Sequence, residues 1–174
     1  MHDIVQDYGP VSAEQNLPKF TDKQLAFWSF LYGEKQNVGP VQRTAIDPFK
    51  LADLLPYIWM ADLIFDKHGS LVDMRPRLMG TKIVELYGER TNENIISNTD
   101  KKGLKNTYPN NFNRLNQALN LMLKINKPIF GQAKSFSTRL SFLSIKGLMI
   151  PAYRNSKTVN LVVGLNEGIE RHFY

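Results

Sequence analysis

Hydrophobic residues recur at helical spacing in two long stretches of the chain and follow strand-like patterns in five others. The first helix is predicted to begin after Thr21, because Thr21 and Gln24 form a capping box, and to end before Gly33. Most of its residues between Leu25 and Tyr32 are aromatic or aliphatic. A surface helix has a single apolar stripe, so this helix should be covered on more than one side.

The stretch from Ile46 to Ile95 predicts five consecutive elements. Asp47 can accept hydrogen bonds from the first turn of a helix, and Pro56 ends that helix. Aromatic and branched residues then predict a strand, a glycine-containing turn, a returning strand and a short helix. In chain order, the five predicted ranges are 47–55, 57–65, 66–70, 71–79 and 81–87.

The C-terminal half predicts one more helix followed by three strands. The helix is expected from Phe112 to Ile125, with Asn110 or Asn111 as its N-cap and Lys127-Pro128 after its end. The strands are expected over residues 129–138, 139–152 and 158–165. In the middle strand one face carries Leu143, Ile145 and Met149, and the other carries Phe142, Leu148 and Ile150. Both faces of the sheet therefore need an apolar cover.

These elements predict an α+β fold, in which a five-stranded antiparallel sheet carries helices on one face. The aromatic N-terminal helix should pack on the other face, either in the same chain or at a dimer interface. Residues 1–19 show no apolar period, which indicates a flexible leader that folding does not need. The expected organisation is a leader at 1–19, the helix and a connector at 20–44, one domain at 45–168 and a tail at 169–174.

Three sequence segments resemble a bacterial single-domain PAS-like family, formerly a domain of unknown function. They are R-T-A-I-D-P from residue 43, L-L-P-Y-I-W-M-A-D from residue 54 and R-P-R-L-M-G-T-K-I-V-E-L-Y-G from residue 75. The resemblance extends back to Q-L-A-F-W-S-F-L-Y-G at 24–33 and, by order of elements, forward to about Asn166. It implies a PAS-like sheet, a pocket covered by the polar segment 90–111, and signalling through the N-terminal helix and the outer sheet face.

Pro76 departs from the family pattern, because the family usually has an aromatic residue at this position. Proline has no N–H group to donate to a neighbouring strand. The strand that contains Pro76 is therefore predicted to lie at the edge of the sheet or to carry a bulge there.

Charge is distributed unevenly along the chain. Residues 1–100 contain 10 Lys and Arg against 14 Asp and Glu, whereas residues 101–174 contain 12 against 2, so the net charges of −4 and +10 give the total of +6. This pattern is typical of a solvated basic face. Alternatively, it indicates attraction to an acidic partner protein, an anionic ligand, lipid or nucleic acid, the last through Lys101, Lys102 and Lys105 beside Tyr108.

Several kinds of chemistry find no support in the residues. The chain has no cysteine, which excludes disulfides and the thiol adduct of light-sensing flavin domains. Its three histidines, His2, His68 and His172, fall in a leader, a turn and the C-terminus, which argues against a haem ligand. No cofactor, metal site or catalytic set is identified, and no apolar run is long enough to span a bilayer. A cytoplasmic location is the resulting expectation.

Asp62 is unusual because it falls inside an apolar strand. One interpretation pairs it across the hairpin with Arg75 or Arg77. The other places Asp62 and Arg77 in a pocket, where they would orient a polar ligand. Three aromatic residues, Tyr57, Trp59 and Tyr87, are core residues first and pocket-lining candidates second.

The function that fits best is a stand-alone PAS-like sensory or regulatory module that acts on a signalling protein, with or without a small-molecule ligand. A homodimer is expected, through an apolar surface made of Phe27, Trp28, Phe30, Leu31, Phe142, Leu148 and Ile150. Two alternatives stay open. One is an enzyme that uses the pocket, and the other is a protein that binds nucleic acid or an anionic surface through its basic C-terminal half.

Overall fold

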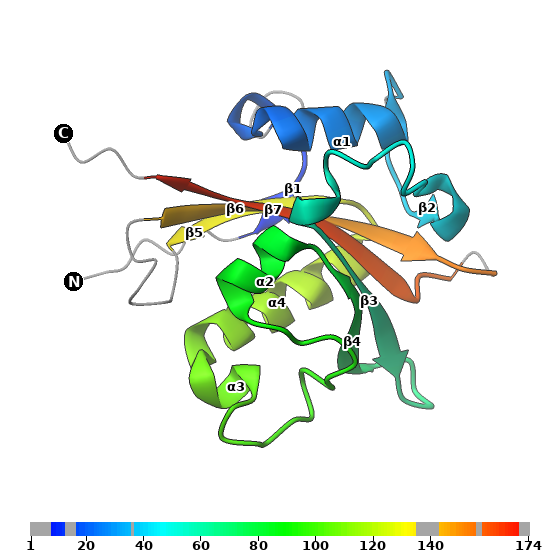
Figure 1. The fold of residues 1–174 in the computed structure, drawn as a ribbon. Helices are drawn as coiled ribbons and strands as arrows, with labels where there is room; N and C mark the ends of the chain where they lie inside the picture. The colour runs from blue at the N-terminus through cyan, green and yellow to red at the C-terminus, as the bar shows by residue number, and fades with distance from the viewer. Residues whose placement is uncertain (1–7, 13–16, 36, 135–142, 156–157, 171–174) are drawn as a thin grey trace.

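The computed structural model describes residues 8–12, 17–35, 37–134, 143–155 and 158–170. It has an α+β architecture, in which helices cover both faces of one open sheet (Figure 1). The helices are α1 (Asp22–Tyr32), α2 (Thr81–Tyr87), α3 (Leu104–Thr107) and α4 (Pro109–Ile125). The strands are β1 (Gly9–Pro10), β2 (Val41–Gln42), β3 (Ile58–Phe65), β4 (Leu71–Met79), β5 (Ile129–Lys134), β6 (Leu143–Tyr153) and β7 (Leu161–Glu170).

The sheet has seven strands rather than the five that the sequence predicts. Its order is β1-β5-β6-β7-β3-β4, and every neighbour on this path is antiparallel. The two additional strands are short. β1 extends the sheet beyond β5, and β2 pairs in parallel with the end of β6. The five long strands lie where the sequence predicts strands, and the α+β class with a mainly antiparallel sheet is confirmed.

The β3–β4 hairpin follows the predicted pattern closely. β4 forms the edge of the sheet, and its pairing with β3 shifts register where Met60 faces Leu78 but Ala61 faces Pro76. The chain therefore accommodates Pro76 in both of the ways that were expected, at an edge and beside a bulge. Beyond the bulge, Asp62 lies directly opposite Arg75.

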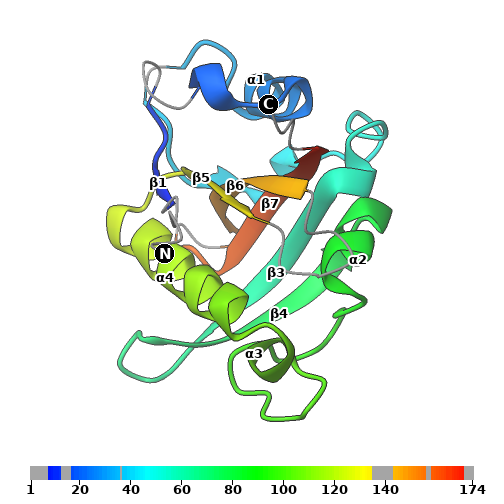
Figure 2. The same cartoon turned by 90° about the vertical axis from the view of Figure 1, so that its left-hand side faces the viewer.

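Helix α1 lies on one face of the sheet, whereas α2, α3 and α4 lie on the opposite face (Figures 1 and 2). The predicted capping box is present, because Gln24 N–H donates to the Thr21 hydroxyl and Thr21 N–H donates to Gln24 Oε1. Gln24 is fully buried, and its Nε2 donates to the carbonyl oxygens of Lys146 and Leu165 in the sheet. These hydrogen bonds attach α1 to the sheet of its own chain.

The predicted dimer surface is mostly the interior of a single chain. Phe27, Trp28, Leu148 and Ile150 are buried together in the core cluster between α1 and the sheet. Leu31 packs against the same cluster, Phe30 is partly exposed, and Phe142 lies outside the described residues. Cover on more than one side of α1 is not found within this chain, and cover by a second copy stays a prediction. One face is buried, and the dimer prediction loses the exposed sheet face on which it rested.

Three other elements differ from the sequence prediction. Residues 48–54 form turns followed by a 3₁₀ helix, Leu55–Tyr57, although Asp47 does accept the Phe49 N–H as expected of a cap. Helix α4 begins at Pro109, so Asn110 and Asn111 lie inside its first turn instead of capping it. The last strand runs over residues 161–170 rather than 158–165, because it continues beside β6 as far as the Leu143–Glu170 pair.

Part of the predicted leader is built into the fold. Gly9 and Pro10 pair with Phe130 and Ile129, and Val11 N–H donates to the carbonyl oxygen of Pro128. Residues 17–19 form a 3₁₀ helix before Phe20, which packs in the core beneath α1. The expectation of a flexible leader therefore does not hold for residues 8–12 and 17–19.

None of the helices among the described residues is both long and apolar enough to cross a membrane.

Candidate ligand-binding site

A cavity of about 110 Å³ lies between the sheet and helices α2, α3 and α4, and it opens to solvent. Its wall is mostly apolar, formed by Trp59, Met74, Pro76, Met79, Ile83, Ile95, Leu104, Leu115, Ala133, Ile145 and Met149. Its polar wall residues are Tyr8, Tyr87, Arg90, Asn111, Arg114 and Asn166. An apolar cavity with a few converging polar groups is the usual form of a small-molecule site.

One side of the cavity carries a short chain of hydrogen bonds. The Trp59 indole Nε1–H donates to Asn166 Oδ1 over 3.1 Å, and Asn166 Nδ2 donates to the Tyr87 hydroxyl, also over 3.1 Å. Burial raises the pKa of Tyr87 to about 12, so this hydroxyl keeps its proton at neutral pH. Because the Tyr87 oxygen already accepts from Asn166, its proton is available to donate to another group.

Tyr8 reaches the cavity from the N-terminal segment and lies over two glycines that face each other, Gly131 of β5 and Gly147 of β6. A Cβ atom at Gly131 would lie 2.7 Å from Tyr8 Cγ, and one at Gly147 would overlap the Tyr8 hydroxyl oxygen. The glycine pair therefore forms a trough that only a strand surface without side chains can provide. Burial raises the pKa of the Tyr8 hydroxyl, as does nearby Tyr87.

Changing Gly131 to Ala should displace Tyr8 from this trough. We expect a loss of about 1–2 kcal/mol in the free energy of unfolding, because the added methyl group overpacks against the ring. In a Tyr8→Ala background the same change should cost almost nothing, so a double-mutant cycle by urea denaturation isolates the contact. An equal cost of Gly131→Ala in both backgrounds would show that Tyr8 does not occupy the trough.

Helix α4 contributes two polar residues to the cavity within one turn, Asn111 and Arg114. Asn111 is only 7% exposed, and its Oδ1 has no hydrogen-bond partner among the described residues. Arg114 brings a positive charge close to Tyr8, where it acts to lower the pKa of the Tyr8 hydroxyl against the effect of burial. None of the described residues that line the cavity is acidic.

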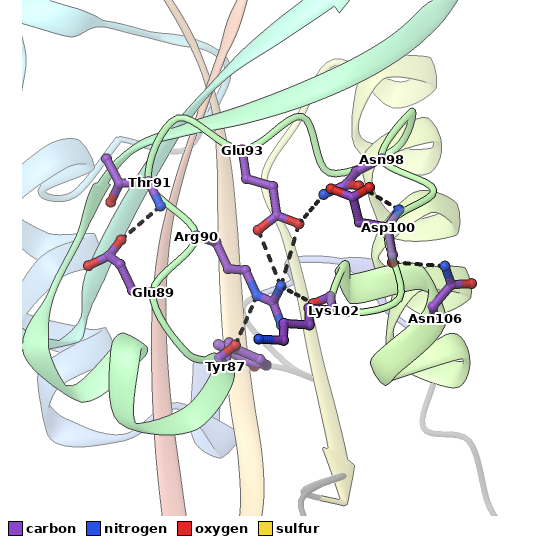
Figure 3. Close-up of polar contacts among 9 residues, drawn as sticks. All are labelled: Tyr87, Glu89, Arg90, Thr91, Glu93, Asn98, Asp100, Lys102 and Asn106. Atoms are coloured by element: carbon purple, nitrogen blue, oxygen red, sulfur yellow. Dashed lines mark hydrogen bonds and ion pairs between the residues drawn. The ribbon is translucent and has the colours of Figure 1, made fainter.

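Residues 88–108, called the covering segment below, connect α2 to α4 and contribute Arg90, Ile95 and Leu104 to the cavity wall. Arg90 organises this segment (Figure 3). Its Nε donates to the Tyr87 carbonyl oxygen, and its Nη1 donates to the Glu93 carboxylate at 3.2 Å and to the Lys102 carbonyl oxygen at 2.7 Å. Arg90 also lines the cavity, so a single side chain contacts both the interior and the segment that covers it.

The covering segment is also attached to the edge strand β4. Two of its backbone N–H groups, those of Asn92 and Ile95, donate to the carbonyl oxygens of Pro76 and Met74. Asp73 is buried and accepts hydrogen bonds from the Ile96 N–H and the Ser97 hydroxyl. A segment predicted as a polar loop is thus fixed at its middle by hydrogen bonds to β4.

The structure places only two of the five predicted pocket residues in the cavity wall, Trp59 and Tyr87. Tyr57 packs against the opposite core cluster, with Lys23 Nζ 4.7 Å from its ring centre. Asp62 points to the same side as Tyr57, since Trp59 and the cavity lie on the other side of β3. There it pairs with Arg77 at 2.6 Å and Arg154 at 2.5 Å, which supports the ion-pair interpretation of Asp62.

Changing Asp62 to Asn should have a small effect, because all three charged groups are partly exposed. We expect a loss of about 1 kcal/mol in the free energy of unfolding at low ionic strength, and a smaller loss in high salt. Urea denaturation at two salt concentrations checks this, with Glu85→Gln as a control for an exposed pair. A loss that does not change with salt concentration would contradict the expectation that dissolved salt screens this ion pair.

The polar residues of the cavity were not identified from the sequence, although two signals were present. Asn111 and Arg114 interrupt the apolar stripe of α4, and Gly131 and Gly147 interrupt two strands. Polar residues inside an apolar stripe and glycines inside strands both indicate a close approach or an interior site. The described part of the chain contains no group of three His, Cys, Asp or Glu residues arranged to hold a metal ion.

Comparisons with protein-family models, with curated proteins and with solved structures gave no match for this chain.

Proposed function

We propose that this chain is a PAS-like regulatory module that binds a small, largely apolar molecule in its cavity. Ligand binding would change the surface that a partner protein recognises. The observation that carries the proposal is the apolar cavity with six polar residues in its wall, among them Asn111, whose buried Oδ1 has no hydrogen-bond partner among the described residues. A structural core has no need of such a space, because packed interiors leave few voids larger than a water molecule.

The arrangement of elements supports the PAS-like part of the proposal. Of the five long strands, two come before helices α2, α3 and α4 and three come after them, and the first of the five, β3, pairs with the last, β7. The covering segment contributes Arg90, Ile95 and Leu104 to the cavity wall, which supports the cover that the sequence resemblance implies for residues 90–111. A ligand enclosed in this way would contact both the sheet and the covering segment.

Arg90 provides a route from the cavity to the surface. A ligand that draws the Arg90 guanidinium toward the cavity would weaken its bonds to Glu93 and to the Lys102 carbonyl oxygen. Lys101, Lys102 and Lys105 are exposed on the same segment. A partner that binds there would be acidic, and its association would weaken as the salt concentration rises.

Native mass spectrometry of freshly purified protein, combined with hydrogen exchange, tests the proposal. We expect a co-purified small molecule, or binding of an added apolar probe, together with a change in exchange confined to residues 88–108 and the cavity wall. Arg90→Lys should keep binding but reduce the change in the covering segment. A cavity that takes up no apolar probe, or occupancy that leaves residues 88–108 unchanged, would contradict the proposal.

A further inference from the structure

Two tyrosine hydroxyl groups lie at the same end of the cavity. Gly147 of β6 faces Asn166 of β7, and a Cβ atom at Gly147 would overlap the Tyr8 hydroxyl oxygen and lie 3.3 Å from Asn166 Oδ1. The Tyr8 hydroxyl is therefore beside the Asn166 amide. The same amide donates from Nδ2 to the Tyr87 hydroxyl over 3.1 Å. Both tyrosines line the cavity, so one end of it carries two O–H groups on either side of a single amide.

Both hydroxyl groups have a proton to donate. Burial raises the pKa of both side chains, to about 12 for Tyr87, so both stay protonated at neutral pH. The Tyr87 oxygen accepts from Asn166, and Asn166 Oδ1 already accepts from the Trp59 indole. Among the described residues, no group accepts the proton of either tyrosine. This end of the cavity therefore offers two O–H donors, which an acceptor oxygen on a ligand would satisfy.

The charged groups of the wall favour an uncharged ligand. Arg90 already donates to Glu93 and to two carbonyl oxygens, and Arg114 has an interaction of its own. None of the described lining residues is acidic. A carboxylate or an ammonium group would therefore lose its water on entering this largely apolar space without gaining a charged partner reserved for it.

The size of the cavity limits the remainder of the molecule. A volume of about 110 Å³ is close to that of the ~150 Å³ cavity known to bind benzene, so one small ring or a short branched chain fits. The apolar part of the wall would surround this ring or chain, and the two hydroxyl groups would meet its polar end.

We propose that the cavity binds a small uncharged carbonyl compound with an apolar body, whose carbonyl oxygen accepts hydrogen bonds from the Tyr8 and Tyr87 hydroxyls. A carbonyl oxygen has two lone pairs, so a single oxygen can accept from both tyrosines. This inference rests on the proposed function, because it names the class of molecule that the same cavity takes.

Three ring probes test the carbonyl group and the charge. Cyclohexanone carries the carbonyl group, methylenecyclohexane has a CH₂ group in place of the oxygen at nearly the same shape, and cyclohexanecarboxylate adds a negative charge. Binding is read from the indole N–H signals in NMR titrations, because the chain has two tryptophans and only Trp59 lines the cavity. The Trp28 signal, from the opposite face of the sheet, is an internal control and is assigned with Trp28→Phe.

The ketone and the alkene differ in how strongly water holds them, so the measured quantity is the change in each dissociation constant between wild type and variant. Tyr8→Phe and Tyr87→Phe should each weaken cyclohexanone binding by about three- to tenfold, as expected for one hydrogen bond, and leave methylenecyclohexane binding within about twofold. Tyr57→Phe, on the opposite face of the sheet, should change neither. The wild-type protein should bind cyclohexanecarboxylate about tenfold more weakly than cyclohexanone.

The stability of Tyr8→Phe checks the availability of its hydroxyl. This variant removes a group that has no hydrogen-bond partner among the described residues, so the midpoint of urea denaturation should not fall. It keeps the test valid if Tyr87→Phe, which removes the acceptor of Asn166 Nδ2, proves unstable. A clear fall of the midpoint in Tyr8→Phe would show that its hydroxyl is already bonded within the protein and would overturn the inference.

Two results separate this inference from the proposed function. If methylenecyclohexane shifts the Trp59 signal but Tyr8→Phe weakens the ketone no more than the alkene, the inference fails and the proposed function stands. Tighter binding of cyclohexanecarboxylate than of cyclohexanone would overturn the inference in the same way. If none of the three probes shifts the Trp59 signal of the wild-type protein, both fail.

Discussion

Changing Gly164 to Ala should lower the free energy of unfolding by about 3 kcal/mol. The same change should displace the Trp59 indole from the cavity wall. Gly164 lies directly opposite Trp59 in the β3–β7 pair. A Cβ atom at this position would overlap the Trp59 indole at Nε1 and Cε2. The indole is buried in the core and bonded to Asn166, so it cannot move aside without losing that hydrogen bond.

Gly39 offers a matched control for this prediction. Apart from Gly39 and its two chain neighbours, no heavy atom of the described residues lies within 4 Å of a Cβ atom at Gly39, so Gly39→Ala should leave stability unchanged within about 0.5 kcal/mol. Urea denaturation gives both values, and the Trp59 indole N–H signal in NMR reports whether its bond to Asn166 is lost. A Gly164→Ala protein with wild-type stability and an unshifted Trp59 signal would contradict the close packing of strand and indole.

Local signals in the sequence were sufficient for the elements that depend on their own residues. The capping box of Thr21 and Gln24 correctly predicts the start of α1, and Pro76 correctly predicts an edge strand with a bulge. Such devices act within a few residues of the chain, through one cap or one missing N–H group. For this reason the prediction holds without knowledge of what packs nearby.

Elements that depend on distant partners could not be predicted in the same way. The strand expected to end at Leu165 continues to Glu170 because β6 supplies partners along that length. Tyr8 belongs to a segment with no apolar period, yet it docks because Gly131 and Gly147 leave a space across the sheet. In both places the tertiary environment decides, and the local composition carries little information about it.

The cavity wall contains residues that local sequence patterns predict and residues that only the tertiary fold brings there. Trp59 and Tyr87 were candidates because they are aromatic residues of the predicted strand 57–65 and the predicted helix 81–87. The polar groups that define its chemistry come from the N-terminal segment, the covering segment, α4 and β7, which the sequence separates by more than 150 residues from Tyr8 to Asn166. Only the fold brings Asn111, Arg114 and Asn166 to one wall.

Changing Phe27 to Ala should lower the free energy of unfolding by about 3–5 kcal/mol, the largest effect we expect of any single substitution in α1. Phe27 is 0% exposed and lies between α1 and the sheet, so the truncation leaves a cavity that the packed strands cannot fill by relaxation. Against a total stability of about 5–15 kcal/mol, such a loss would leave a large unfolded fraction on mild heating.

Phe30 provides the contrast on the same helix, because 38% of it is exposed. Phe30→Ala should cost less than about 1 kcal/mol, and the variant should sediment at micromolar concentration like the wild-type protein. Both results follow if α1 serves its own sheet, since its buried face is then already occupied. A shift from dimer to monomer in Phe30→Ala would show that the exposed side of α1 joins two copies of the chain. That result would restore the dimer on the outer side of this helix, while leaving the loss in Phe27→Ala to packing within one chain.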